Sequence, residues 1–148
     1  MATHPRKTIR EKVVTLLSAG VAGAGGRVYD SREKQPVATG PFVVVKTILD
    51  QSPPEDQYGL SLPTYQRQLE LEVHCVETGR PTSGTLAGDA DDLAREVEEY
   101  LADYVDLDGL VLTCLLTAST MEEGLDVDPP AFRVVLTYQV IYEDALGN

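Results

Sequence analysis

Three side chains that could carry acid–base chemistry are spaced two residues apart in one stretch of the chain. Glu70, Glu72 and His74 occupy alternate positions of segment 65–77, so an extended backbone places them on the same face. Successive members of the row would lie about 6.6–7 Å apart, which could set a proton donor beside an acceptor. A strand face that meets solvent or a neighbouring subunit explains the same pattern, and we favour that explanation.

Neither metal binding nor nucleotide binding is predicted. His74 and Cys75 are adjacent, so on a strand their side chains point to opposite faces, and the sequence has no C-x-x-C pair. Segment 106–109 resembles part of a calcium-binding loop, but Tyr104 and Leu115 would then stand at the first and twelfth ligand positions. We therefore expect no catalytic residue, no metal and no cofactor, and we expect that the protein is not an enzyme.

Length and composition favour one globular domain over residues 1–148. The chain is 43% hydrophobic, a usual value for a folded protein, and it has no run of about 18 apolar residues that could span a membrane. The first residues lack the pattern of a secretory signal. Cys75 and Cys114 both lie in apolar, strand-like runs, so we expect buried, reduced thiols.

The net charge of −12 is unevenly distributed. Residues 1–34 carry a net +4, to which Arg27, Arg32 and Lys34 contribute, and the remaining residues carry −16. An acidic surface of this kind gains no counterion-release energy from duplex DNA, so specific DNA binding is not expected. The two charged regions could instead provide complementary faces for neighbouring copies.

Periodicity predicts two helices and five strands. The predicted helices are 8–18 and 89–104; the predicted strands are 26–32, 42–49, 65–77, 110–118 and 132–143. Neither helix can bury its apolar stripe alone. We therefore predict an α+β fold: a two-layer sandwich in which both helices pack on one face of a mixed, mostly antiparallel sheet of about five strands.

The predicted connections at 50–64, 78–88 and 119–131 are long and polar. Segment 50–64 contains three prolines and joins two strong strands, whereas ordinary hairpins use about two to five residues. Tyr58 and Tyr65 flank part of it; tyrosine favours interfaces, although these two could equally pin the loop to the domain. The candidate residues for a subunit or tube interface are Arg27, Arg32, Lys34, Tyr58, Tyr65, Glu70, Glu72 and His74.

Several local features, in their order along the chain, resemble a known family. An N-terminal amphipathic helix precedes the segments GRVYDSR and PFVVV, and a long polar loop leads to YQRQLELEVHCVE. The acidic helix segment LAREVEEYL and the tyrosine-bearing segment VVLTYQVIYE follow. In this organisation the chain resembles the tail terminator proteins of long-tailed bacteriophages, typified by minor tail protein U.

The resemblance implies a structural virion protein in the neck region of the tail, assembled in the host cytoplasm. Such proteins form a homohexameric ring that caps the tail tube, stops its polymerisation and presents a surface to the head connector. The implied partners are further copies of the chain, the tail tube protein and a head-proximal connector, while DNA passes through the lumen without specific binding. Three alternatives remain open: another neck component, such as a head–tail joining or head-closure protein; a small enzyme using Glu70, Glu72 and His74; and a monomeric binding module.

Overall fold

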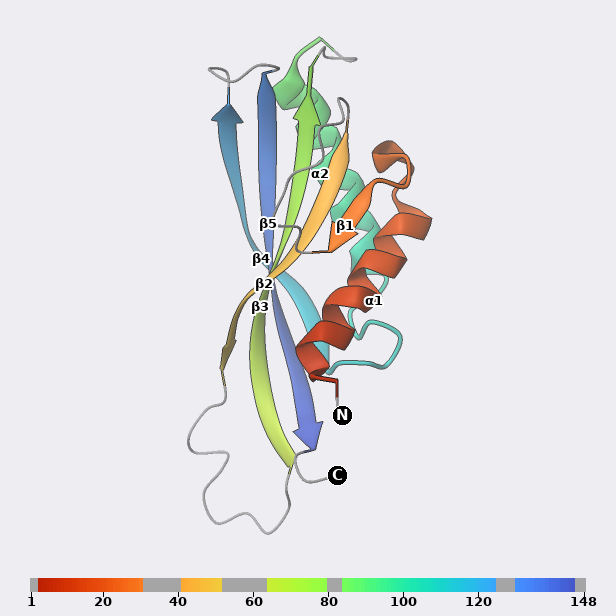
Figure 1. Ribbon diagram of the computed structural model, residues 1–148, viewed down its shortest axis with the longest axis vertical. Coiled ribbons are helices and arrows are strands. Elements are labelled where there is room, and N and C mark those ends of the chain that lie inside the picture. Colours follow the sequence, from red (N-terminus) through yellow and green to blue (C-terminus); the bar gives the residue numbers. More distant parts are fainter. Residues whose placement is uncertain (1–2, 31–40, 52–63, 80–83, 125–129, 146–148) are drawn as a thin grey trace.

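A computed structural model describes residues 3–30, 41–51, 64–79, 84–124 and 130–145. Within these ranges the elements are α1 (Pro5–Gly20), the 3-10 helix η1 (Ala22–Ala24), β1 (Val28–Asp30), β2 (Phe42–Gln51), β3 (Thr64–Thr78), α2 (Leu86–Ala102), β4 (Thr113–Gly124) and β5 (Ala131–Ala145). The strands form one open sheet in the order β1-β2-β3-β5-β4 (Figure 1). Only β1 and β2 are parallel among these pairs; the other pairs are antiparallel. The predicted α+β fold with a mixed, mostly antiparallel sheet is confirmed.

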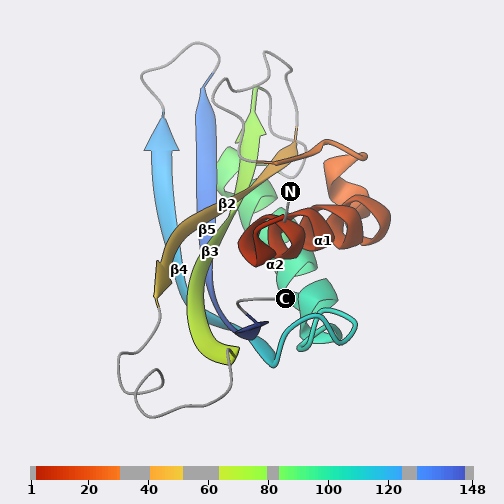
Figure 2. The same ribbon diagram turned by 60° about the horizontal axis from the view of Figure 1, so that its bottom comes forward.

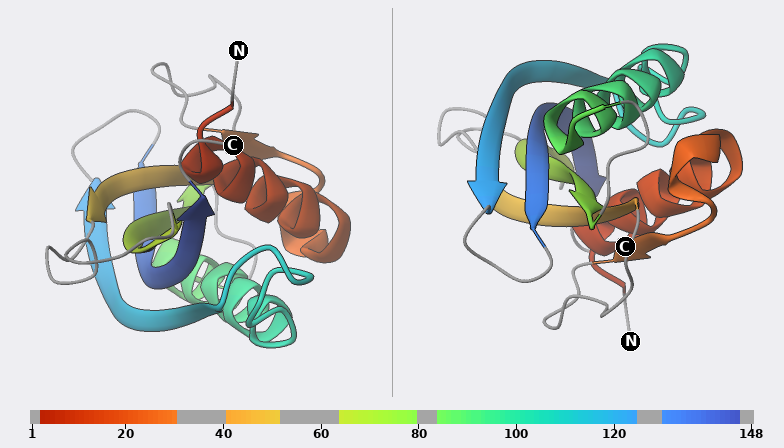
Figure 3. Two further views of the ribbon diagram at one scale, coloured as in Figure 1. Left: turned by 90° about the horizontal axis from the view of Figure 1, so that it is seen from below. Right: turned by 90° about the horizontal axis from the view of Figure 1, so that it is seen from above.

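Both helices lie on the same face of the sheet, as predicted (Figure 2, Figure 3). α1 packs over β1 and β2, while α2 packs over β3 and β5. The buried helix residues are Ile9, Val13, Leu16 and Leu17 of α1 and Ala90, Leu93, Ala94, Val97 and Leu101 of α2. They meet one face of the central strands in a single cluster that includes Leu71, Leu136 and Tyr142. We call this the inner face of the sheet, and the opposite side the outer face.

Both helices begin three residues before their predicted starts, because of their caps. α1 was predicted to start at Thr8, but it starts at Pro5 with His4 as its N-cap. The Nδ1 atom of His4 accepts the backbone N–H of Arg6 at 3.1 Å, and proline fits the first helical turn because it has no N–H to leave unpaired. α2 starts at Leu86 rather than 89, because Thr85 Oγ1 accepts the N–H of Gly88 at 2.9 Å.

β4 differs most from its predicted range, because it covers residues 113–124 instead of 110–118. The first half of the predicted loop 119–131 belongs to the strand, since the ladder to β5 continues to the pair Gly124 and Ala131. Before β4, Leu107, Asp108 and Gly109 have positive φ values of 48°, 59° and 83° and form a turn. Leu107 is fully buried within this turn, and its burial offsets the cost of that backbone conformation.

The two central strands extend slightly beyond their predictions, which gave 65–77 for β3 and 132–143 for β5. β2 likewise continues to Gln51, two residues into the predicted loop 50–64; residues 52–63 of that loop lie outside the described ranges. β1 covers Val28–Asp30 of the predicted strand 26–32, of which residues 31 and 32 lie outside the described ranges. The sheet twists strongly, so that its long strands cross near the middle of the molecule in projection (Figure 1).

Two β-bulges change which side chains face inward. In β2 the register shifts between Thr47 and Leu49, so Ile48 is the extra residue. Beyond the bulge Asp50 instead of Leu49 takes the inward position opposite Leu69. In β4 a second shift between Leu116 and Ala118 does the same to the far half of that strand.

Candidate interaction surfaces

The predicted row on β3 lies on the outer face, but its three members differ in exposure. Glu70 and Glu72 are partly exposed, as expected. His74 was expected on a solvent-facing or subunit-facing surface, yet only 7% of it is accessible. Its neighbours across the sheet are Val44 of β2 and Val135 of β5, both buried. The outer face is therefore wet at Glu70 and apolar at His74.

Glu72 and His74 form a hydrogen-bonded pair. The Nε2 atom of His74 lies 2.9 Å from Oε1 of Glu72, so Nε2–H donates to the carboxylate. Burial lowers the pKa of His74 below 6.5, and the nearby cations Lys46 and Arg133 act in the same direction, while Glu72 opposes them. The imidazole is therefore neutral at pH 7, as part of the packing of the outer face.

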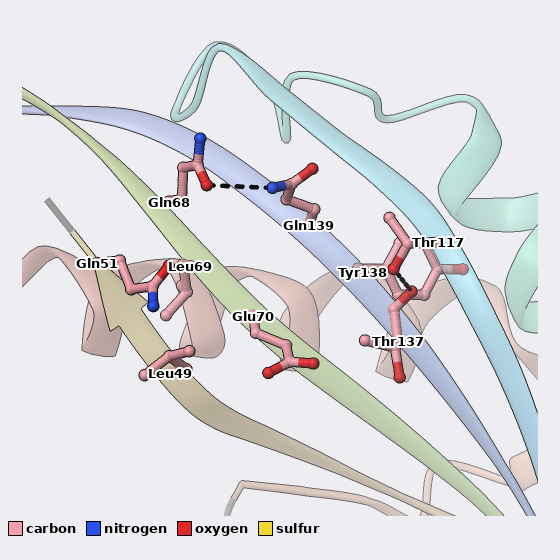
Figure 4. Close-up of a pocket in the computed structure, with 9 residues that line it drawn as sticks. All are labelled: Leu49, Gln51, Gln68, Leu69, Glu70, Thr117, Thr137, Tyr138 and Gln139. Carbon is pink, nitrogen blue, oxygen red and sulfur yellow. Dashed lines mark hydrogen bonds between the residues drawn. The ribbon is translucent and has the colours of Figure 1, made fainter. Parts of the chain in front are cut away.

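A hollow of about 340 Å³ crosses the outer face at the opposite end of the row (Figure 4). Its lining comes from four strands: Leu49, Gln51, Gln68, Leu69, Glu70, Thr117, Thr137, Tyr138 and Gln139. The side-chain amide of Gln139 donates to that of Gln68 at 3.3 Å, and Thr117 donates to the carbonyl of Thr137 at 3.1 Å. Glu70 is the one carboxylic acid in this lining, and His74 is not part of the lining. The structure thus separates Glu70 from the Glu72–His74 pair and supplies no acid–base pair in the hollow.

The remaining predicted interface residues are scattered. Arg27 is half-buried, and its Nε–H donates to the carbonyl of Pro41 at 2.8 Å, which ties the start of β1 to the start of β2. The backbone of Tyr65 pairs with Asp144 in the β3–β5 ladder. Arg32, Lys34 and Tyr58 lie outside the described residues.

A charged cluster on the inner face ties three strands to the first turn of α1. The buried carboxylate of Asp50 accepts the hydroxyl of Tyr142 at 2.8 Å and lies 3.4 Å from both Arg6 and Arg67. Arg67 also donates to Asp144 at 2.8 Å. These buried charges are paired, which is the condition for their being tolerated. The sequence analysis missed this cluster, because Asp50 and Tyr142 are 92 residues apart and only the bulge turns Asp50 inward.

β4 carries an apolar surface that the sequence analysis also missed. Cys114 near the start of β4 packs in the core, but the inner face beyond it is left exposed, since α2 packs mainly on β3 and β5. Leu115, Leu116 and Met121 are exposed by 52%, 42% and 61%. Among the described strands, β4 pairs with β5 alone, so its other backbone edge is unpaired. The apolar run 110–118 predicted a strand, but its pattern does not reveal which of its side chains stay exposed.

A second, smaller apolar surface lies on β2. Ile48 and Leu49, at the bulge, are exposed by 50% and 48%. Within the described residues, β1 pairs with β2 only along Val43–Val45, so the later part of β2 is a sheet edge. The two exposed apolar surfaces therefore lie on opposite edges of the same sheet.

Other kinds of site receive no support from the described residues. They contain no group of three or more His, Cys, Asp and Glu side chains that could hold a metal ion. No helix among them is both long and apolar enough to cross a membrane. Cys75 and Cys114 are free and buried, as predicted, and burial raises the pKa of each thiol to about 12.

Comparison with known proteins gives a structural neighbour. No protein-family model and no curated protein sequence matches this chain. Among solved structures, a chain from the virion of a native gene transfer agent (GTA) particle superposes with a TM-score of 0.62 at 14% sequence identity. The match covers 92% of this chain and 95% of the other. At this identity the comparison establishes that the two chains share a fold.

Proposed function

We propose that the protein is a structural component of a virion, and that within this class it acts as a tail terminator. The observation that carries the proposal is the near full-length fold likeness to a chain of the GTA virion particle. The organisation of the sequence, which resembles phage tail terminators, agrees with it. The protein then forms a ring, taken as a hexamer from that resemblance, which caps the tail tube and joins it to the head connector.

The exposed strand β4 supports this function. A long sheet edge with exposed leucine and methionine side chains is costly in a monomer, because it invites pairing with other chains and leaves apolar area in water. A ring subunit needs such surfaces, since each copy must contact two neighbours. The net charge of −12 also suits a ring whose lumen lets DNA pass, because like charges repel.

The proposal is tested by adding the purified protein to polymerising tail tube protein of the same virus. We expect a ring at one tube end in negative-stain images, a native mass of six copies, and tubes that stop growing. The control is bovine serum albumin at equal mass. Tubes of unchanged length without rings at their ends would refute the terminator role. Rings that bind the connector and ignore tubes would indicate another neck component, and a ring with a basic lumen would contradict the proposed DNA passage.

A further inference from the structure

We infer that the two exposed apolar surfaces at opposite edges of the sheet bind each other between successive copies of this chain. We define surface A as Leu116, Met121 and Glu123, all on the inner face of β4, and surface B as Arg6 with Ile48 and Leu49 of β2. Surface A of one copy contacts surface B of the next. This inference rests on the proposed ring and specifies which residues of the chain close it.

The position of the two surfaces on opposite sheet edges supports this contact. The contact joins two different surfaces, so it is heterologous, and repeating it generates a ring or a filament rather than a closed pair. Both surfaces lie on sheet edges that have no strand partner within the described ranges. Two such edges can continue the ladder from one copy to the next, which satisfies the unpaired backbone groups as well as the apolar side chains.

The second argument is the vacancy in the helix layer. α1 and α2 cover the inner face from β1 to β5 and leave β4 exposed beyond Cys114 (Figure 3). Leu116 and Met121 face inward on β4, paired with the inward-facing Tyr138 and Val134. Leu116 and Met121 are exposed because, within the described residues, no third helix packs beside α2 over this part of β4. A neighbouring copy can cover the side chains instead.

The third argument is charge. Glu122 and Glu123 lie exposed beside Met121 on β4. Arg6, Ile48 and Leu49 line a second hollow of about 320 Å³, which shares Leu49 with the hollow of Figure 4. α1 has four basic residues against Glu11. Surface A is therefore apolar with an acidic rim, and surface B is apolar with a basic rim. Pairing A with B brings opposite charges together, whereas A with A or B with B repels.

Disulfide trapping tests the pairing directly. Met121→Cys and Ile48→Cys are made as separate variants, mixed in equal amounts and oxidised gently; both positions are exposed, and the native thiols are buried. We expect the crosslink between positions 121 and 48, identified by peptide mass, to exceed the 121–121 and 48–48 crosslinks at least tenfold. A double variant carrying both cysteines should form a ladder of oligomers. Predominant 121–121 or 48–48 crosslinks, or no crosslinks at all, would overturn the inference.

A charge variant measures the contribution of the rim. Glu123→Lys should weaken self-association about tenfold in sedimentation experiments, because it places a cation against Arg6 of the neighbour. Glu99→Lys is the matched control, since it makes the same change at an exposed site on α2, and it should leave association unchanged. Equal weakening by both variants would show only a net-charge effect and would contradict the assigned contact. Rings that cap tubes normally in Met121→Asp would overturn the inference while leaving the terminator function intact.

Discussion

β3 and β4 are both long antiparallel strands with apolar side chains, yet they have opposite relations to the core. β3 lies between two partner strands and under α2, and Leu69, Leu71, Val73 and Cys75 are fully buried. Among the described strands β4 pairs with β5 alone, and no helix covers it beyond Cys114, so Leu115, Leu116 and Met121 are exposed. Apolar residues in a strand therefore indicate a contact surface, and the layer above the strand decides whether the contact is within the chain.

The largest difference between the strands should appear in stability. Leu71→Ala on β3 is expected to lower the free energy of unfolding by about 2–5 kcal/mol, because it opens a cavity in a closed core. Leu116→Ala on β4 removes a side chain that is 42% exposed and should cost less than about 1.5 kcal/mol in the monomer. Urea unfolding at low protein concentration measures both. Equal losses would show that β4 belongs to the core.

Losing a buried ion pair beside β3 should also cost more stability than losing an exposed ion pair on β4. Asp144→Asn weakens the pair with Arg67 beside β3, where the carboxylate of Asp144 is buried, and should cost about 1–3 kcal/mol. Glu122→Gln removes the exposed 3.7 Å pair with Arg133 and should cost less than about 0.5 kcal/mol. The same unfolding measurement checks both variants. A larger loss for Glu122→Gln would reverse the comparison.

Thiol labelling compares the two strands without perturbing their packing. Cys75 of β3 and Cys114 of β4 are both buried, and each thiol pKa is raised to about 12 by burial, so neither reacts until the structure opens. An edge strand held by one ladder opens locally more often than a central strand. In single-cysteine variants, Cys114 should react about tenfold faster than Cys75, a difference of about 1.4 kcal/mol in opening energy. Ring formation should reduce this ratio, whereas equal rates in the monomer would contradict local opening of β4.

The pH dependence at His74 should be smaller and should come from β3. Burial lowers the pKa of His74 in the folded state below its ordinary value of 6.5. Between the folded-state pKa and pH 6.5, the unfolded state therefore binds more protons than the folded state. The stability contribution of neutral His74 is therefore present above about pH 6.5 and is lost as the pH falls. His74→Gln should flatten the fall in melting temperature between pH 7 and pH 5. An unchanged pH profile would show that the imidazole is not desolvated.

Glu77, also on β3, should act in the opposite direction. Burial, followed by the charge of Asp89, raises the pKa of Glu77 to about 7, while Arg27 opposes the shift. The folded state binds more protons than the unfolded state between about pH 4.5 and 7, so stability falls as the pH rises through this range. Glu77→Gln should remove that slope in thermal unfolding curves. A steeper slope in the variant would contradict this assignment.

The elements that were predicted well are those in which the order of apolar and polar residues matches which side chains are buried. The alternation in β3 gave its range to within one residue at each end, because its inner face is buried from Leu69 to Cys75. The helix stripes identified all the buried residues of α1. The far half of β4 could not be predicted, because Ser119, Thr120, Glu122 and Glu123 are held by backbone pairing with β5 and bury little apolar area.

The interaction surfaces were predicted less well, because they depend on the relation between distant elements. The exposure of Leu116 and Met121 follows from where α2 ends up, which no local pattern encodes. Likewise His74 sits in a polar row along its strand but is enclosed by Val44 and Val135 from neighbouring strands. The bulge at Ile48 in β2 turns Asp50 inward and Leu49 outward. Alternation alone does not reveal such a one-residue change of register.

In the proposed ring, a newly made copy would have to remain soluble until it meets its neighbours, and the bulge in β4 would help it do so. A bulge bends the strand and increases its twist, so the unpaired edge is not flat. A flat edge can recruit almost any extended peptide, whereas a bent one matches only an edge with a corresponding bend. β2 has its own bulge at Ile48, on the opposite edge of the sheet. The bulge that interrupts the β4 ladder would thus hinder aggregation while still allowing the proposed contact with another copy of the chain.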